Sequence, residues 1–157
     1  MDKYDKIFRS RGILNQSLSS QEAVASVAIL TTSADSSFED VDIELLVDIL
    51  WGFEIFEEYS DEDLSEMLDK LINLGEINGA GALFNSAKKQ LYDEFLKDAF
   101  AAGVSVVLDE EEMLIPSAHI HLIKSLQQAL NIDNKEAEEI IEEVISVFHE
   151  AEFEDLL

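Results

Sequence analysis

The most constraining feature of this sequence is the helical spacing of its apolar residues. In the clearest stretch, Leu64, Met67, Leu68, Leu71 and Ile72 occupy positions i, i+3, i+4, i+7 and i+8, which form one face of an α-helix. No segment sustains the alternation of apolar and polar residues that is typical of a strand. One proline and six glycines among 157 residues also argue against a turn-dense β architecture. The sequence therefore predicts an all-α protein of about seven helices.

Local start and stop signals set the expected helix ranges. The run Ser19-Ser20-Gln21-Glu22 has the form of a capping box, which begins a helix. Residues 23–32 are apolar nearly all round, which predicts a central buried helix. Gly75 is a plausible stop for the third helix, and Pro116 is a plausible start for the sixth. The expected helices cover residues 19–32, about 39–56, 60–75, 77–90, 92–108, 116–130, and 133 or 134 onward.

Two parts of the chain resemble each other. A shift of 77 positions places apolar residues of segment 27–49 on apolar residues of a later stretch, and a shift of 73 does the same for residues 64–71. We therefore expect two pseudo-repeated three-helix units joined by the fourth helix. The helical domain would cover residues 19–150. It would lie between a lead-in segment of residues 1–18, which either docks or frays, and a fraying acidic tail of residues 151–157.

The charge balance narrows the range of partners. Thirty-five acidic and 10 basic residues leave a formal charge of −25 at pH 7. This balance disfavours nucleic acid, because phosphate backbones are bound mainly by Lys and Arg. Between Arg11 and Lys70 the chain has fifteen Asp and Glu and no basic residue. Such a stretch attracts cations or a basic protein partner, unless the excess acid serves solubility alone.

Several function classes lack their sequence signals. The chain has no cysteine, which excludes disulfides, thiolate nucleophiles and cysteine zinc sites. Motifs of phosphate loops, dinucleotide-binding folds, serine hydrolases and zinc proteases do not occur. No apolar run is long enough to cross a membrane, and the N-terminus has no signal-peptide core. We therefore expect a cytoplasmic, non-enzymatic protein that does not insert into membranes.

The first candidate site is the acidic loop between the first two expected helices. Asp42 lies on the apolar stripe of the second helix, which continues through Leu45, Leu46, Ile49 and Phe53. Its carboxylate is therefore expected to point toward the core, where an uncompensated charge is costly. Asp35 enters the same turn from the preceding helix, and Glu39 lies in the first turn of the next one. Clustered carboxylates repel unless a proton or cation lies between them. These three residues are candidate ligands for a divalent cation. The alternative role of Asp35 and Glu39 is helix capping, and the alternative for Asp42 is a structural acid satisfied by backbone N–H groups.

The corresponding loop of the second unit offers two further candidates. Glu112 and His119 are seven positions apart, as Asp35 and Asp42 are, and His119 lies on the apolar stripe of its helix. His121 lies about 200° further round that helix, so the two histidines cannot bind one ion together. Glu112 and His119 therefore join the candidate ligands. The alternative for His119 is a hydrogen-bonded residue at the edge of the core.

A family resemblance covers about residues 20–150. The two acidic hairpins, the run Lys124–Ile132 and the segments Tyr59–Leu64 and Met67–Leu71 resemble the tellurite-resistance TerB family, particularly its cyanobacterial-looking members. The resemblance implies an all-helical fold with pseudo-twofold repeats and a cytoplasmic role in stress or metal-related responses. It also implies an acidic site for divalent cations and a connection to membrane-associated complexes.

The family pattern maps onto the two acidic loops. Members typically carry A-D-G-x-[IV], with a further acid seven residues after the Asp. Asp35 and Asp42 match these two acids in the first unit, with Ser36 in place of the Gly. In the second unit, Glu112 stands for the Asp and His119 for the later acid.

Two functions stay open at this point. The first is a non-enzymatic helical module that binds a divalent cation (calcium, magnesium, manganese or zinc), with the first acidic loop as its main site. The second is a protein-interaction scaffold whose charged surface meets a basic partner and whose ion site is degenerate.

Overall fold

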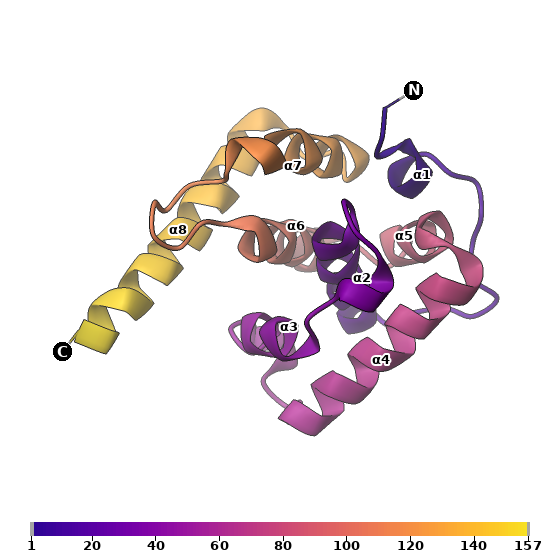
Figure 1. Ribbon diagram of the computed structural model, residues 1–157, viewed down its shortest axis with the longest axis horizontal. Coiled ribbons are helices and arrows are strands. Elements are labelled where there is room, and N and C mark those ends of the chain that lie inside the picture. Colours follow the sequence, from indigo (N-terminus) through magenta and orange to yellow (C-terminus); the bar gives the residue numbers. More distant parts are fainter. Residues whose placement is uncertain (1, 157) are drawn as a thin grey trace.

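The computed structural model describes residues 2–156, and the side chains of residues 2–150. This part of the chain is all-helical, as the sequence predicts, with eight α-helices and two short 3₁₀ helices (Figure 1). The eighth α-helix is a short one inside the lead-in segment. The elements are α1 (Asp5–Phe8), α2 (Ser20–Ser33), η1 (Phe38–Asp40), α3 (Ile43–Leu50), η2 (Glu54–Phe56), α4 (Asp61–Asn78), α5 (Ala80–Lys88), α6 (Asp93–Val107), α7 (Ser117–Ala129) and α8 (Asn134–Leu156).

Helix α2 lies at the centre of the molecule, as predicted (Figure 1). The capping box forms: the Glu22 N–H donates to Ser19 Oγ at 3.0 Å, and the Ser19 N–H donates to Glu22 Oε1 at 2.8 Å. Every residue from 23 to 30 is at most 2% exposed. Helix α6 packs along α2, where a side-chain carbon at Gly103 would lie 2.6 Å from Leu126 of α7 and 3.1 Å from Thr31 of α2. The missing side chain lets these three helices approach one another.

The lead-in segment docks onto the domain. Tyr4 and Ile7 are each 2% exposed, and α1 packs against α5 and α7. Further along, the Leu14 N–H donates to Ser86 Oγ at 2.9 Å, and the Asn85 side-chain amide donates to the Ser10 carbonyl at 2.8 Å. Of the two alternatives for residues 1–18, the structure has the docked one. Nothing in the helical periodicity decides this, because the contacts come from distant α5 and α7.

The expected helix 39–56 is wrong in length and in its buried face. The segment instead contains η1, the eight-residue α3 and η2. Leu46 and Leu50 are fully buried, whereas Leu45, which was assigned to the buried stripe, is 44% exposed. Gly52 follows α3 and favours a break, and after this break the chain turns so that Phe56 is fully buried. The segment therefore buries Leu46 and Leu50 from α3 and Phe56 from η2, and it does so with two short helices instead of one long helix.

Gly75 does not end its helix. It is buried within α4, which continues to Asn78 and ends at Gly79, whose φ is +97°. A positive φ is readily adopted by glycine. A side-chain carbon at Gly75 would lie 2.6 Å from the Phe38 ring, so its role is to admit that ring from η1.

The second half follows the predicted order of helices, with α6, α7 and α8 after the connector α5. α7 spans nearly the expected residues. α8 runs away from the body at the lower left of Figure 1 and continues to Leu156, so the backbone through most of the predicted tail is helical. Residue 157 and the side chains of 151–156 lie outside the described part. Within residues 2–156, no helix combines the length and apolar character of a membrane span.

Candidate functional site

Asp35, the first predicted ligand, is compensated by the N-terminal segment. Lys3 Nζ lies 2.7 Å from Asp35 Oδ1, and the Tyr4 hydroxyl donates to the same carboxylate at 3.0 Å. The Lys3 ammonium holds the pKa of Asp35 below its ordinary value, with help from the Tyr4 hydroxyl. Lys3 precedes α2 and Asp35 follows it, so no pattern within the acidic loop identifies Lys3 as the compensating charge. The apolar and basic character of residues 3–9 was the available signal that this segment docks.

Asp42 does not point toward the core, so that prediction is wrong. It is exposed and forms the N-cap of α3, where its Oδ1 accepts a hydrogen bond from the Leu45 N–H at 3.2 Å. Glu39 is also exposed, in η1. The error follows from the helix start: since α3 begins at Ile43, Asp42 lies before the helix rather than on its stripe. The alternative for Asp42, a structural acid satisfied by a backbone N–H group, is confirmed by this cap.

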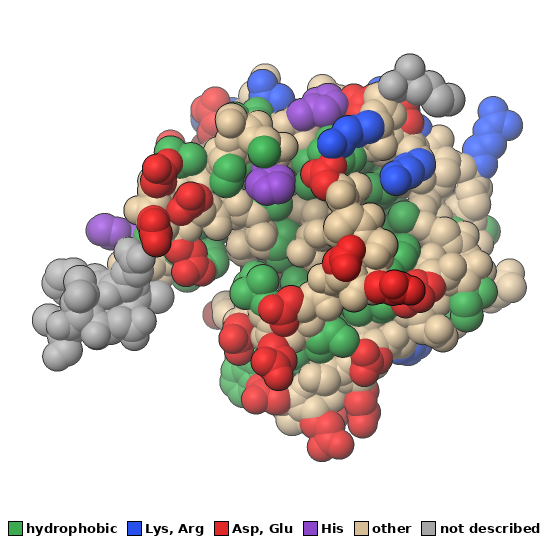
Figure 2. Space-filling view, in the orientation of Figure 1, with side chains coloured by type: hydrophobic (Ala, Val, Ile, Leu, Met, Phe, Trp, Pro, Cys, Tyr) green, Lys and Arg blue, Asp and Glu red, His purple; other side chains and the backbone are tan. Residues whose placement is uncertain are grey.

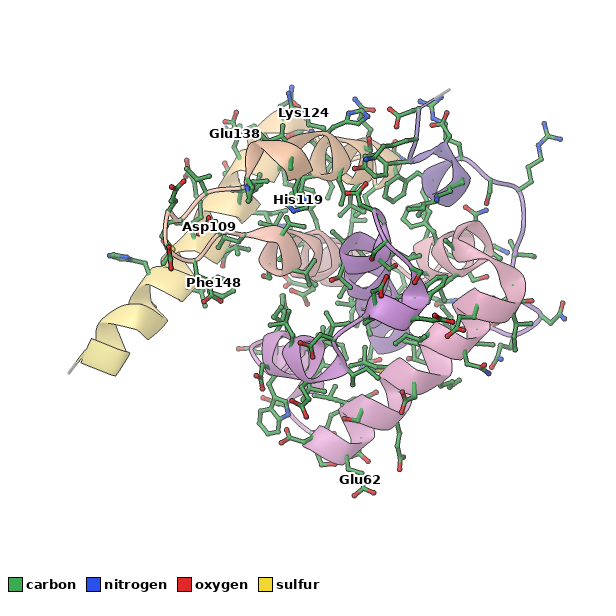
Figure 3. All side chains as sticks on the ribbon, viewed as in Figure 1. Glu62, Asp109, His119, Lys124, Glu138 and Phe148 are labelled. Atoms are coloured by element: carbon green, nitrogen blue, oxygen red, sulfur yellow. The ribbon has the colours of Figure 1, made fainter. Side chains whose placement is uncertain are left out.

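The second predicted loop is organised by a residue that was not among the candidates. Asp109 Oδ1 accepts hydrogen bonds from the N–H groups of Glu111 at 2.9 Å and Glu112 at 3.2 Å, and its backbone pairs with Leu114. The Glu112 side chain is exposed. Two successive N–H groups on one carboxylate form a local turn, so this loop is explained without a ligand. Figure 3 shows Asp109 on the loop that leads from α6 toward α7.

His119 is half-buried near the start of α7 (Figure 3). Its Nδ1 is buried and has no hydrogen-bond partner among the described residues. The imidazole is near enough to Asp35 to act on that carboxyl electrostatically. No hydrogen bond or ion pair joins His119 to Asp35 among the described residues. The structure assembles no group of three or more His, Asp or Glu with metal-site geometry among the residues it describes.

A second histidine helps to hold the N-terminal segment in place. His121 Nε2 lies 2.6 Å from Asp2 Oδ2, and the His121 and Tyr4 rings lie 5.4 Å apart between centroids. Near α1, Arg9 also pairs with Asp5 at 3.6 Å. Charged groups at this end of the molecule are therefore largely neutralised within the chain.

The opposite situation holds in residues 39–69, which we call the acidic lobe. Its thirteen Asp and Glu are all exposed, and the stretch contains no Lys or Arg. Figure 2 shows acidic side chains gathered over α3 and the adjoining end of α4. Two large apolar side chains are exposed among them, Leu45 at 44% and Trp51 at 47%. The lobe combines negative charge with accessible apolar surface.

One edge of the acidic lobe borders a cleft of about 510 Å³ between α4 and the start of α2. Its lining includes Glu22, Tyr59, Glu66 and Lys70. Lys70 Nζ lies 2.6 Å from Glu22 Oε2. Burial favours a higher pKa for Glu22, but the Lys70 ammonium and the Ser19 N–H outweigh it and lower that pKa. Lys70 and Glu22 thus form an ion pair at this edge of the lobe.

A further group of acids extends from the lobe toward α8. Asp98 of α6 is half-buried and faces Glu94, Glu54 of η2 and Glu143 of α8. Burial, followed by the repulsion of those three carboxylates, raises the pKa of Asp98 to about 6. No Lys or Arg forms an ion pair with Asp98 in the described part of the chain. Sequence periodicity alone did not identify this residue, because its neighbours come from three different elements.

Comparisons with known proteins leave the family open. The sequence matches no protein-family model, and searches of curated proteins and of solved structures also find no match. The resemblance to TerB proteins therefore stays a prediction.

Proposed function

We propose that this chain is a non-enzymatic helical module that binds a basic protein partner through the acidic lobe. The observation that carries the proposal is the exposure of all thirteen acidic side chains of residues 39–69 in a stretch without Lys or Arg. Opposite charge accelerates encounter and selects the partner, and exposed apolar side chains add the contact that charge alone does not supply. Like charge disfavours nucleic acid and anionic membranes.

The cellular setting is part of the same proposal. The TerB resemblance supports a cytoplasmic role in stress or tellurite-resistance-type responses, with a basic protein of a membrane-associated complex as the partner. The acidic lobe fits that role, because a module that joins a complex needs a recognition surface rather than a catalytic centre.

The test compares two charge reversals of equal size on the full chain. The first variant carries Glu62→Lys, Glu66→Lys and Asp69→Lys in the acidic lobe. The matched control carries Glu138→Lys, Glu139→Lys and Glu142→Lys on α8, which are also exposed. Binding of a Lys- and Arg-rich peptide is measured by calorimetry at fixed ionic strength. We expect at least a tenfold loss of affinity for the lobe variant and a much smaller loss for the control. Equal losses in the two variants would overturn the proposal.

Divalent-cation binding is a second candidate function, and one observation favours it. The unpartnered, buried Nδ1 of His119 lies in the neighbourhood of Asp35, and imidazole with carboxylate is a common ligand pair for transition metals. The ion would take the place that the Lys3 ammonium now holds beside Asp35. Carboxylates alone would suit calcium or magnesium, so the pair favours zinc or manganese.

Thermal shifts with calcium, magnesium, manganese and zinc, each at constant ionic strength, test this second function. A binding ion raises the melting temperature because it stabilises the folded state by mass action. The shift should disappear in Asp35→Asn and His119→Gln and persist in Asp42→Asn and in the control His149→Gln, whose residue is exposed on α8. Shifts of equal size in all four variants would rule out this site.

A further inference from the structure

Helix α3 leaves one face without a partner. Its inner face is formed by Leu46, Val47 and Leu50, which are at most 6% exposed and pack toward α4 and α6. On the outer side, Leu45 is 44% exposed and Trp51, at the C-terminal end of the helix, is 47% exposed. Together the exposed indole and leucine side chains form an apolar surface on one short helix, and such surfaces mark sites of protein contact.

Helix geometry places a carboxylate between these two apolar groups. Positions three residues apart lie about 60° apart around an α-helix, so the exposed Asp48 lies between Leu45 and Trp51 on the outer face. Trp51 keeps helical backbone angles, with φ −59° and ψ −22°, so the same geometry applies to it. The pattern is apolar, acidic, apolar, and it is surrounded by the other acids of the lobe. A complementary partner presents apolar, basic and apolar groups at a similar spacing.

We propose that the outer face of α3 docks a basic amphipathic helix of the partner protein, with its apolar side chains on Leu45 and Trp51 and a Lys or Arg on Asp48. This inference rests on the proposed function and names its contact. Charge complementarity selects the occupant. A second copy of this chain would bring another charge of −25 to the same face, and like charges placed together disfavour association.

The chain itself contains an example of the expected contact. Residues 2–9 include three basic side chains and contain the short helix α1, which packs on the body. Tyr4 and Ile7 of this segment are buried, while Lys3 meets the Asp35 carboxylate at 2.7 Å. This segment therefore combines buried apolar side chains with a basic side chain on a carboxylate. We expect the partner helix to present the same combination to the outer face of α3.

The length of α3 sets the scale of the interaction. Eight residues at 1.5 Å each extend about 12 Å, which spans about two turns of a partner helix. A contact of that size is smaller than a standard stable interface. We therefore expect a reversible complex, with affinity in the micromolar range and a steep dependence on salt.

The single tryptophan of the chain, Trp51, reports directly on this face. The probe is a peptide of Leu and Lys in which Leu recurs at positions i, i+3, i+4 and i+7, and the control is a scrambled peptide of the same composition. When the amphipathic peptide binds the full chain, Trp51 emission should shift to the blue and become protected from iodide quenching, because the indole leaves water. The scrambled peptide, with equal charge, should produce little shift.

Variants with matched controls locate the contact by calorimetry. Asp48→Lys is paired with Glu138→Lys, since both positions are exposed and Figure 3 shows Glu138 at the end of the molecule opposite to the lobe residue Glu62. Leu45→Ser is paired with Ile77→Ser, whose residue is 72% exposed on α4. We expect at least a tenfold loss of affinity for each α3 variant and less than a threefold loss for each control. Melting temperatures confirm that all four variants fold.

The outcomes separate this inference from the function on which it rests. If the amphipathic peptide binds and the charge reversal of Glu62, Glu66 and Asp69 weakens it, but Asp48→Lys and Leu45→Ser behave like their controls, the lobe binds basic partners elsewhere and the α3 site is wrong. If neither peptide binds the chain at low salt, the proposed function fails as well. If both peptides bind equally and Trp51 emission does not change, charge alone is recognised and the docking face is overturned.

Discussion

The N-terminal segment and the acidic lobe differ in whether their charged side chains form ion pairs within the chain. In the former, Asp35 meets Lys3, Asp5 meets Arg9 and Asp2 meets His121. In the acidic lobe, none of the thirteen acids forms an ion pair within the part of the chain that the structure describes. One basic side chain, Lys3, thus helps to attach the N-terminal segment to the body. The acids of the lobe face solvent instead, and this is the surface that the proposed function uses.

The largest expected change in the free energy of unfolding comes from removing the buried aromatic ring of the N-terminal segment. Tyr4→Ala removes an aromatic ring that is 2% exposed and should lower the free energy of unfolding by about 3–5 kcal/mol, as other large-to-small changes at buried aromatic positions do. Urea denaturation measures it. Tyr92→Ala is the control, because Tyr92 is 55% exposed, and it should cost less than about 1 kcal/mol. Similar losses for the two variants would mean that the segment is not held by burial of Tyr4.

The next effect tests a lobe acid that caps a helix, Asp42. Asp42→Ala removes the N-cap of α3 and should destabilise the protein by about 1 kcal/mol without any ion present. Asp42→Asn should cost only a few tenths of that value, because Asn is also a good N-cap. The neighbouring comparison is Glu39→Ala, because Glu39 is exposed and its side chain forms no hydrogen bond among the described residues. A cost for Asp42→Ala that appears only when a divalent ion is added would instead indicate a ligand.

A substitution at Asp98 of α6 should change the free energy of unfolding by a similar amount, but should stabilise the protein. The pKa of Asp98 is raised to about 6 from an ordinary 3.8, so the folded protein binds this proton more tightly than the unfolded chain does. The free energy of unfolding should therefore fall as pH rises from about 4 to about 6. Asp98→Asn should remove this part of the pH dependence and stabilise the protein at pH 7, on the order of 1 kcal/mol after allowance for solvent screening. Denaturation at pH 4, 5, 6 and 7 measures both; an unchanged pH profile in the variant would contradict the assignment.

The smallest effect concerns the exposed ion pair at the N-terminal side. Lys3→Met should lower the free energy of unfolding at pH 7 only slightly, because the Lys3 side chain is 65% exposed and water screens the pair. The pKa of Asp35 lies below its ordinary value in the folded protein, so the contribution of the pair is present at neutral pH and lost as pH falls and Asp35 becomes protonated. The difference between variant and wild type should thus shrink in acid and in high salt. A difference that grows in acid would contradict the pair.

The inward face of α8 shows how far the period of apolar residues predicts burial. The helical stripe of residues 137–148 predicts Ile141 as a core residue, but the structure leaves it half-buried, while Ile140 beside it is 6% exposed and Val144 is 7% exposed. Periodicity locates the inward side of a helix to within one position. It does not rank the positions on that side, because the ranking depends on the helix that packs against it.

The sequence alone predicts the all-α class, the central α2 and its cap at Ser19. These features follow from local physics: the period of apolar residues and hydrogen bonds within one turn. The pairing of Lys3 with Asp35, the start of α3 after Asp42 and the exposure of Leu45 and Trp51 come from the tertiary structure. Each of these depends on contacts between residues far apart in the chain, and no local pattern records which distant surface covers a side chain and which leaves it open.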